Sequence, residues 1–67
     1  MTQTIYLFDE IATINIDYYE PKFTDLMEED ILYIINAVHD GELEPESNLK
    51  IGWVRFHYSV TFEPYDR

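Results

Sequence analysis

The acidic residues of this chain are spaced closely enough to act as a charged binding surface. Residues 28–30 are all acidic, and Glu42, Glu44 and Glu46 alternate with other residues. Because alternate residues of an extended chain lie on the same side, roughly 6.6 Å apart, these three carboxylates would form a row. Phosphates along one DNA strand advance about 3.4 Å of axis per nucleotide, so every second phosphate has a similar spacing. The pattern therefore predicts a set of negative charges that could occupy a phosphate-binding groove.

The same acids could instead bind calcium or simply face water. An EF-hand loop has acids at positions 1, 3 and 5, Gly at position 6 and Glu at position 12. Counted from Asp40, Gly41 falls at the second position and Pro45 interrupts the loop. The chain also has no cysteine for a thiolate metal site. We therefore expect no metal and no cofactor, and a solvated charged loop is the alternative to the carboxylate row.

The remaining candidates for chemistry give no catalytic arrangement. His39 falls near the end of a predicted helix, where a positive charge is favourable for the helix dipole. His57 and Ser59 are two residues apart on a predicted strand, but a Ser and a His alone do not form a catalytic triad. Gly41 and Gly52 are isolated and form no phosphate-binding loop. We expect that the protein is not an enzyme.

The net charge restricts the kind of partner. The chain has 14 acidic and 4 basic residues, a net charge of −10, and all but two of the acids lie in the first 46 residues, where Lys22 is the only base. Such a charge repels nucleic acid and anionic membranes, and it accelerates encounters with basic surfaces. We therefore expect a basic protein as partner, in the first place a nucleic-acid-binding protein, and no direct binding of nucleic acid or membrane.

Composition and length favour one folded domain over a disordered chain. Of the 67 residues, 46% are apolar, 16% are aromatic and only two are glycine, unlike a disordered acidic segment. We expect a single domain over residues 1–67, with a core so small that a homodimer would supplement it. The longest apolar run is far below the roughly 18 residues of a membrane helix, and the N-terminus does not resemble a signal peptide. These features predict a cytoplasmic protein, in the host cytoplasm if a phage encodes it.

Three segments have the composition and alternation of β-strands. Residues 3–8 and 11–19 are rich in β-branched and aromatic types, with residues 9–10 as the turn of a hairpin. Pro21 ends the second segment. From residue 49 to residue 62 the alternation returns, and it predicts one long final strand.

A helix is predicted from about Asp25 to His39. Asp25 and Glu28 are three residues apart and match a capping box, and the acids of the first turn suit the helix dipole. Gly41 is a natural helix stop, and residues 42–48 are expected to form a polar loop. The apolar stripe that should face the core consists of Met27, Ile31, Ile34, Ile35 and Val38.

The order of these segments predicts a small α+β domain, β-β-α-β, in which one helix packs on one face of a three-stranded antiparallel sheet. The other face of the sheet would then be uncovered. Alternation places on this face an aromatic set that is too apolar for ordinary exposed sheet. We expect it to be a dimer interface, to be covered by the C-terminal tail, or to bind a partner directly through Tyr6, Phe8, Trp53 and Arg55.

The outer side of the helix is the main candidate for a partner surface. Tyr33 falls among acids there, and tyrosine is enriched at interfaces, while carboxylates beside it could bind Arg or Lys. Ordinary partial burial is the alternative for each tyrosine. The candidate partner-binding residues are Glu28, Glu29, Asp30, Tyr33, Asn36, Asp40, Glu42, Glu44 and Glu46.

In its small size, acidity, lack of cysteine and aromatic content, the whole chain resembles the DNA-mimic inhibitors that phages and other mobile elements use against CRISPR effectors, restriction enzymes, uracil-DNA glycosylase or nucleoid proteins. The resemblance lies in composition and charge, and no diagnostic residue accompanies it. It implies a non-enzymatic inhibitor of a basic nucleic-acid-binding surface, such as an anti-CRISPR or anti-restriction protein. The alternative is an antitoxin, immunity or adaptor protein that binds a basic partner through the aromatic sheet face.

Overall fold

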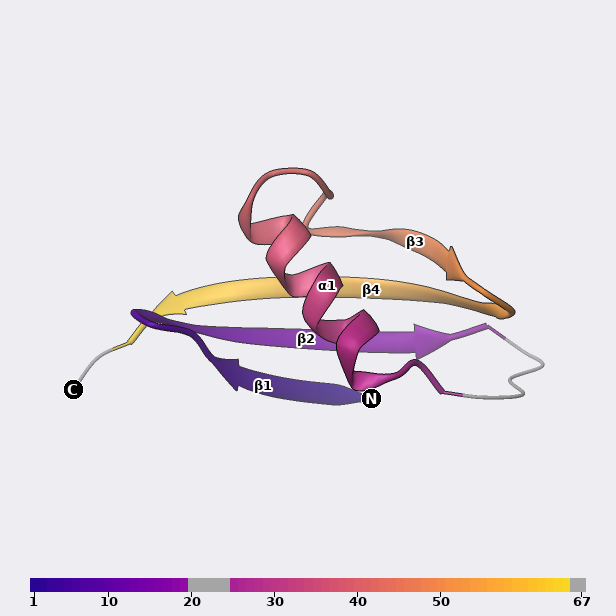
Figure 1. Cartoon of the computed structure of the whole chain (residues 1–67), viewed down its shortest axis with the longest axis horizontal. Coiled ribbons are helices and arrows are strands. Elements are labelled where there is room, and N and C mark those ends of the chain that lie inside the picture. The colour runs from indigo at the N-terminus through magenta and orange to yellow at the C-terminus, as the bar shows by residue number, and fades with distance from the viewer. Residues whose placement is uncertain (20–24, 66–67) are drawn as a thin grey trace.

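Four antiparallel strands form one sheet in the order β1-β2-β4-β3, and a helix crosses one face of it (Figure 1). The computed structural model describes residues 1–19 and 25–65. The predicted α+β domain with one helix is confirmed, but the sheet has four strands instead of three. The elements are β1 (Thr2–Tyr6), β2 (Glu10–Tyr18), α1 (Glu28–His39), β3 (Glu46–Ile51) and β4 (Val54–Pro64).

The predicted long final strand is wrong because the chain turns back at Gly52 and Trp53. These two residues connect β3 to β4, and Gly52 has φ +60°. A glycine with positive φ at the first central position is typical of a type II′ hairpin turn, whose twist matches that of the flanking strands. Residues 46–48, predicted as loop, consequently belong to β3 and pair with residues 57–59 of β4.

The connection from β2 to β3 passes over β4. Because β2 and β3 each pair antiparallel with β4, they run parallel to each other on its two sides. The chain between them contains α1, which runs obliquely over the sheet from the β1 side toward the β3 side (Figure 1). The helix therefore covers one face, and its carboxyl end comes close to the edge that β3 forms.

The core lies between α1 and the covered face of the sheet. Directly paired residues share a face, so the register places the apolar residues of β2 and β4 together. Ile14, Ile16, Phe56 and Tyr58 are fully buried, and Ile34 of the helix packs onto the same cluster. Of the predicted apolar stripe of the helix, Met27 does not belong to the core, because it precedes the first turn and is 64% exposed.

The helix begins later than predicted. Met27 is the N-cap, its backbone is extended, and its side chain makes no capping hydrogen bond, so the proposed capping box of Asp25 and Glu28 is wrong. The physical reason is Leu26, which is buried and whose N–H donates to the Tyr18 hydroxyl over 3.3 Å. This contact holds the chain extended up to Met27. The prediction for Pro21 lies outside the described residues.

The helix ends as predicted, at a glycine. Gly41 has φ +84°, its N–H donates to the Val38 carbonyl at 3.1 Å, and the Glu42 N–H donates to the Ala37 carbonyl at 2.8 Å. These two bonds define a Schellman motif, which requires a left-handed residue after the last turn. The motif turns the chain away from the helix axis and directs the following acids toward β3.

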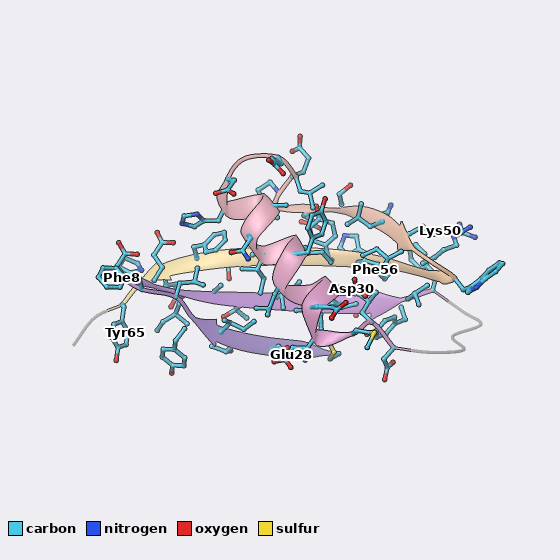
Figure 2. The ribbon with its side chains drawn as sticks, viewed as in Figure 1. Phe8, Glu28, Asp30, Lys50, Phe56 and Tyr65 are labelled. Atoms are coloured by element: carbon cyan, nitrogen blue, oxygen red, sulfur yellow. The ribbon has the colours of Figure 1, made fainter. Side chains whose placement is uncertain are left out.

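The centre of the uncovered face of the sheet is polar, so the expected aromatic set covers only part of this face. In its centre Thr13 pairs with Thr61, and Asn15 pairs with Ser59. Tyr6 lies on this face as predicted, through its pairing with Ile11, but Phe8 and Trp53 belong to the hairpin turns at opposite ends of the molecule (Figures 1 and 2). Each of these side chains is exposed, at 99% and 85% respectively, but they share no surface.

Candidate functional site

Charged side chains are divided unequally between the two sides of the sheet. Lys50 and Arg55, the only lysine and arginine among residues 1–19 and 25–65, are paired neighbours on the uncovered face. The helix side carries no described Lys or Arg. The carboxylates on this side come from β2, α1 and the loop after α1, and they include Glu10, Glu28, Glu29, Asp30, Asp40, Glu42 and Glu44.

The outer ridge of α1 carries acids around an exposed tyrosine. Glu29, Tyr33, Asn36 and Asp40 follow one another at helical spacing and are all exposed, and the Tyr33 side chain is 58% exposed. Leu32, at 38% exposure, adds a second apolar group beside this ridge. We call the exposed residues of this region the acidic helix surface: Glu28, Glu29, Leu32, Tyr33, Asn36, Asp40, Glu42 and Glu44.

The three consecutive acids at the start of the helix do not act as one cluster. Successive helical residues are rotated by about 100°. Figure 2 accordingly shows Glu28 toward β1 and Asp30 on the other side of the helix. Glu28 and Glu29 are exposed, whereas Asp30 is partly buried. Asp30 is therefore a weaker candidate for partner contact than its two neighbours.

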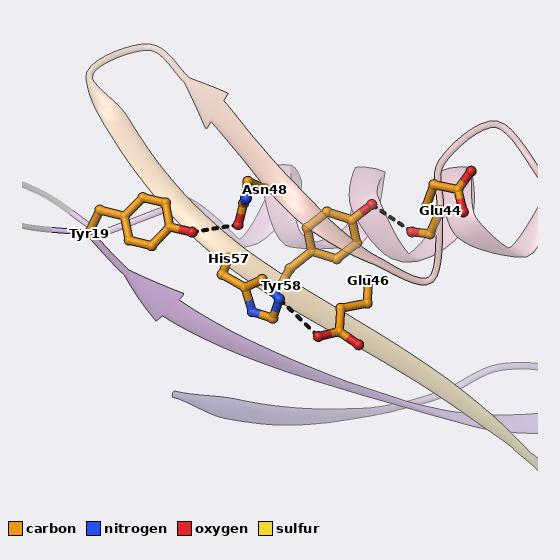
Figure 3. Close-up of polar contacts among 6 residues, drawn as sticks. All are labelled: Tyr19, Glu44, Glu46, Asn48, His57 and Tyr58. Atoms are coloured by element: carbon orange, nitrogen blue, oxygen red, sulfur yellow. Dashed lines mark hydrogen bonds and ion pairs between the residues drawn. The ribbon is translucent and has the colours of Figure 1, made fainter.

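The predicted row of Glu42, Glu44 and Glu46 is wrong, because the third acid lies on the other side of the sheet. Glu46 is the first residue of β3 and pairs with Ser59, which places it on the uncovered face. There its Oε2 lies 3.0 Å from Nε2 of His57 (Figure 3). Glu42 and Glu44 lie in the loop before β3, outside any strand, and both are exposed.

A cavity of about 410 Å³ opens between the carboxyl end of α1, the following loop and the covered side of β3. Its lining combines apolar side chains with polar groups, and two exposed acids, Glu42 and Glu44, belong to it. Sequence reasoning missed this cavity, because its lining comes from α1, the following loop, β3 and β4, which only the fold brings together. The lining residues are Val38, Gly41, Glu42, Leu43, Glu44, Pro45, Ser47, Leu49 and Tyr58.

Tyr58 fixes the loop that carries these acids. Its ring is fully buried, and its hydroxyl donates a hydrogen bond of 2.6 Å to the Glu44 carbonyl (Figure 3). Burial of the ring raises the pKa of Tyr58, and the negative charge of Glu44 raises it further. Alternation alone placed Tyr58 on a strand, but no sequence signal indicated that its hydroxyl reaches the loop.

His39 has a structural position at the end of the helix. Its Nε2 lies 3.2 Å from Oε1 of Glu10, a buried oxygen that has no other hydrogen-bond partner among the described residues. Its Nδ1 lies 3.8 Å from Oδ1 of Asp40, and its ring contacts Phe62 edge-on at 5.3 Å. These contacts join the last helical turn to β2 and β4, close to the acidic helix surface.

The residues predicted as a second interface do not come together. Tyr6 contacts Tyr65 edge-on at 5.9 Å near one end of the sheet, the end where Phe8 also lies. Arg55 lies on the uncovered face toward the other end, close to the turn that carries Trp53. The homodimer remains a prediction, and these four residues do not form one continuous surface.

Comparisons with known proteins give no match, so the site is interpreted from its geometry. No protein-family model matches the chain, and no curated protein or solved structure matches it. Within residues 1–19 and 25–65, no group of three metal-binding side chains is suitably placed to hold an ion. The same residues contain no helix of the length and apolar character needed to cross a membrane.

Proposed function

We propose that this protein is a non-enzymatic inhibitor that binds the basic nucleic-acid-binding surface of another protein through the acidic helix surface. The support is the separation of charge: the helix side carries the carboxylates of the helix and the loop without a described Lys or Arg. A basic surface that normally binds phosphates is complementary to such a field. Binding to the acidic helix surface would therefore exclude nucleic acid by direct competition.

The acids at the carboxyl end of α1 are the main support for this proposal. Acids in the first helical turn, such as Glu28 and Glu29, are favourable for the helix dipole and have a structural explanation. Asp40, Glu42 and Glu44 lie at or beyond the opposite end, where the dipole disfavours negative charge by about 0.3–1 kcal/mol per group. Stability of the helix does not explain them, whereas recognition of a basic surface does.

The exposed apolar groups supply the non-electrostatic part of the interface. Tyr33 and Leu32 lie among the acids of the helix, and neither belongs to the core. Long-range attraction mainly accelerates association, whereas buried aromatic anchors slow dissociation. We expect Tyr33 to be such an anchor, surrounded by carboxylates that contact Lys and Arg of the partner.

A capture experiment with matched charge variants tests the proposal. The full chain is immobilised and exposed to a nuclease-treated lysate of its native cells, and retained proteins are eluted with salt. Each retained protein is then tested for displacement of a fluorescent DNA or RNA duplex by the free protein. We expect displacement that weakens steeply as the salt concentration rises.

Two double variants remove the same charge from the two sides of the sheet. Glu42→Gln with Glu44→Gln should weaken displacement by about tenfold, equivalent to about 1.4 kcal/mol. Glu46→Gln with Glu63→Gln, on the uncovered face, should leave it nearly unchanged. A captured protein that binds the duplex and this chain simultaneously would refute the proposal, as would equal effects of the two double variants.

A further inference from the structure

We infer that the cavity at the carboxyl end of α1 receives one arginine side chain of the basic partner, an inference that rests on the proposed function. The cavity is about 410 Å³ in volume, within the usual range for ligand sites of about 300–1,000 Å³. It adjoins the acidic helix surface, since Glu42 and Glu44 belong to both. An arginine that enters it would anchor the partner at the edge of the contact surface.

The lining matches an arginine in its two chemical parts. Val38, Leu43 and Leu49 form an apolar wall suited to the methylene stem. Glu42 and Glu44 are exposed residues of the lining, and their carboxylates would bind the guanidinium group. A phosphate or an acidic side chain would be repelled by the same two charges, so the cavity selects a cation.

The guanidinium group is preferred over an ammonium group at this site. It presents five N–H donors in one plane, so it can bond two separate carboxylates at once, whereas lysine is a compact and strongly hydrated point charge. Arginine is also among the residues most enriched at the energetic centres of protein interfaces. A partner that binds phosphates through arginine would therefore offer the matching side chain.

The cavity is held in shape before any partner binds. The loop of residues 41–45 is fixed to the sheet by the Tyr58 hydroxyl, which donates to Glu44, and by the Val60 N–H, which donates to the Pro45 carbonyl at 2.8 Å. At its other end the Leu43 N–H donates to the Ala37 carbonyl at 3.2 Å. A preformed site loses little conformational entropy on binding, which favours an anchor position.

A titration with N-acetylargininamide tests this inference without the partner. Backbone amide shifts of the full chain are followed by NMR during the titration, with N-acetylcitrullinamide as the neutral isostere. We expect saturable shifts centred on Gly41, Leu43, Ser47 and Leu49, and a dissociation constant for the citrulline compound that is at least about tenfold higher. Shifts spread evenly over all acidic residues, or equal binding of both compounds, would overturn the inference.

A pair of matched variants tests whether the arginine compound binds inside the cavity. Ser47→Phe adds a ring to the covered side of β3 inside the cavity, and Thr61→Phe adds the same ring to the uncovered face of β4, without a change in charge in either case. Ser47→Phe should abolish the localised shifts, and Thr61→Phe should preserve them. The Glu42→Gln, Glu44→Gln double variant leaves the cavity unfilled and should also abolish the shifts. Persistence of the shifts in folded Ser47→Phe protein would overturn the inference.

The two proposals fail in different ways. If the arginine compound does not bind but salt-sensitive displacement of nucleic acid is observed, the acidic helix surface functions without the cavity, and only this inference is wrong. If the compound binds in the cavity but no retained protein is displaced from nucleic acid, the proposed inhibition is wrong, and the assignment of an arginine to a basic partner loses its basis.

Discussion

Replacement of Tyr58 by phenylalanine isolates the hydrogen bond that fixes the acidic loop. The ring stays in the core, so no cavity is created, and the change removes only the 2.6 Å bond from the hydroxyl to the Glu44 carbonyl. A neutral hydrogen bond contributes about 0.5–1.5 kcal/mol to stability. In the variant the Glu44 carbonyl loses this partner, but it lies in a loop beside an open cavity and can bind water. We therefore expect the free energy of unfolding to fall by only about 1 kcal/mol. For a domain of this size, that loss lowers Tm by about 4–8 °C.

The pH dependence of this difference provides a second, independent result. The pKa of Tyr58 is raised above 10.0 in the folded protein, by burial first and by Glu44 second. A group with a raised pKa contributes stability that is fully present below its unfolded pKa and is lost as pH rises through the folded value. The gap in stability between the wild type and Tyr58→Phe should therefore be constant between about pH 7 and pH 9 and shrink above about pH 10.

Urea unfolding followed by circular dichroism at several pH values measures both effects. Tyr33→Phe is the control, because Tyr33 is 58% exposed on the helix, and its stability should stay within about 0.5 kcal/mol of the wild type. The reasoning would be refuted if Tyr58→Phe were as stable as the wild type at neutral pH. A gap that stays the same through the alkaline range would show that Tyr58 is not the titrating group.

Three further changes test the core, the β3–β4 turn and the helix dipole. Ile34→Ala, at a fully buried position, should lower the free energy of unfolding by about 2–5 kcal/mol, whereas Leu32→Ala should lower it by about 1 kcal/mol or less. Equal losses for the two variants in urea unfolding would contradict the packing of the helix. Gly52→Ala should cost about 1–2 kcal/mol because φ is +60°, and an unchanged Tm would exclude this turn geometry. At low salt, Glu29→Gln should destabilise by about 0.3–1 kcal/mol and Asp40→Asn should stabilise by a similar amount; the same sign for both in thermal unfolding would contradict the dipole argument.

The sequence alone predicted the structure correctly where a local pattern is compatible with only one conformation. The isoleucines of the helix repeat at helical spacing, and Ile31, Ile34 and Ile35 are buried as predicted. Gly41 ends the helix because few other residues adopt a left-handed conformation easily. The first hairpin was also identified, although its turn is formed by residues 7–9 and Glu10 already belongs to β2.

The sequence did contain a signal for β3, the strand that was not predicted. The apolar residues before Gly52 and those after it do not follow one continuous alternation. Leu49 and Ile51 occupy odd positions, whereas Val54 and Phe56 occupy even ones, and all four face the helix side. In one continuous strand these pairs would point to opposite faces. The change of phase at Gly52 marks a two-residue turn, and it also explains why Trp53 belongs to the turn and not to a sheet face.

The sequence by itself determined that this protein carries a large negative charge on a small α+β fold, because charge and local periodicity are properties of the chain. Only the tertiary structure decided that Glu42 and Glu44 line a cavity while Glu46 pairs with His57 on the opposite side of the sheet. Side chains on a strand alternate between faces, so a single step along the chain reverses the surface that a residue joins. Which face is covered depends on the pairing of β3 with β4 and on the path of α1 above them, and no short segment of the sequence contains that information.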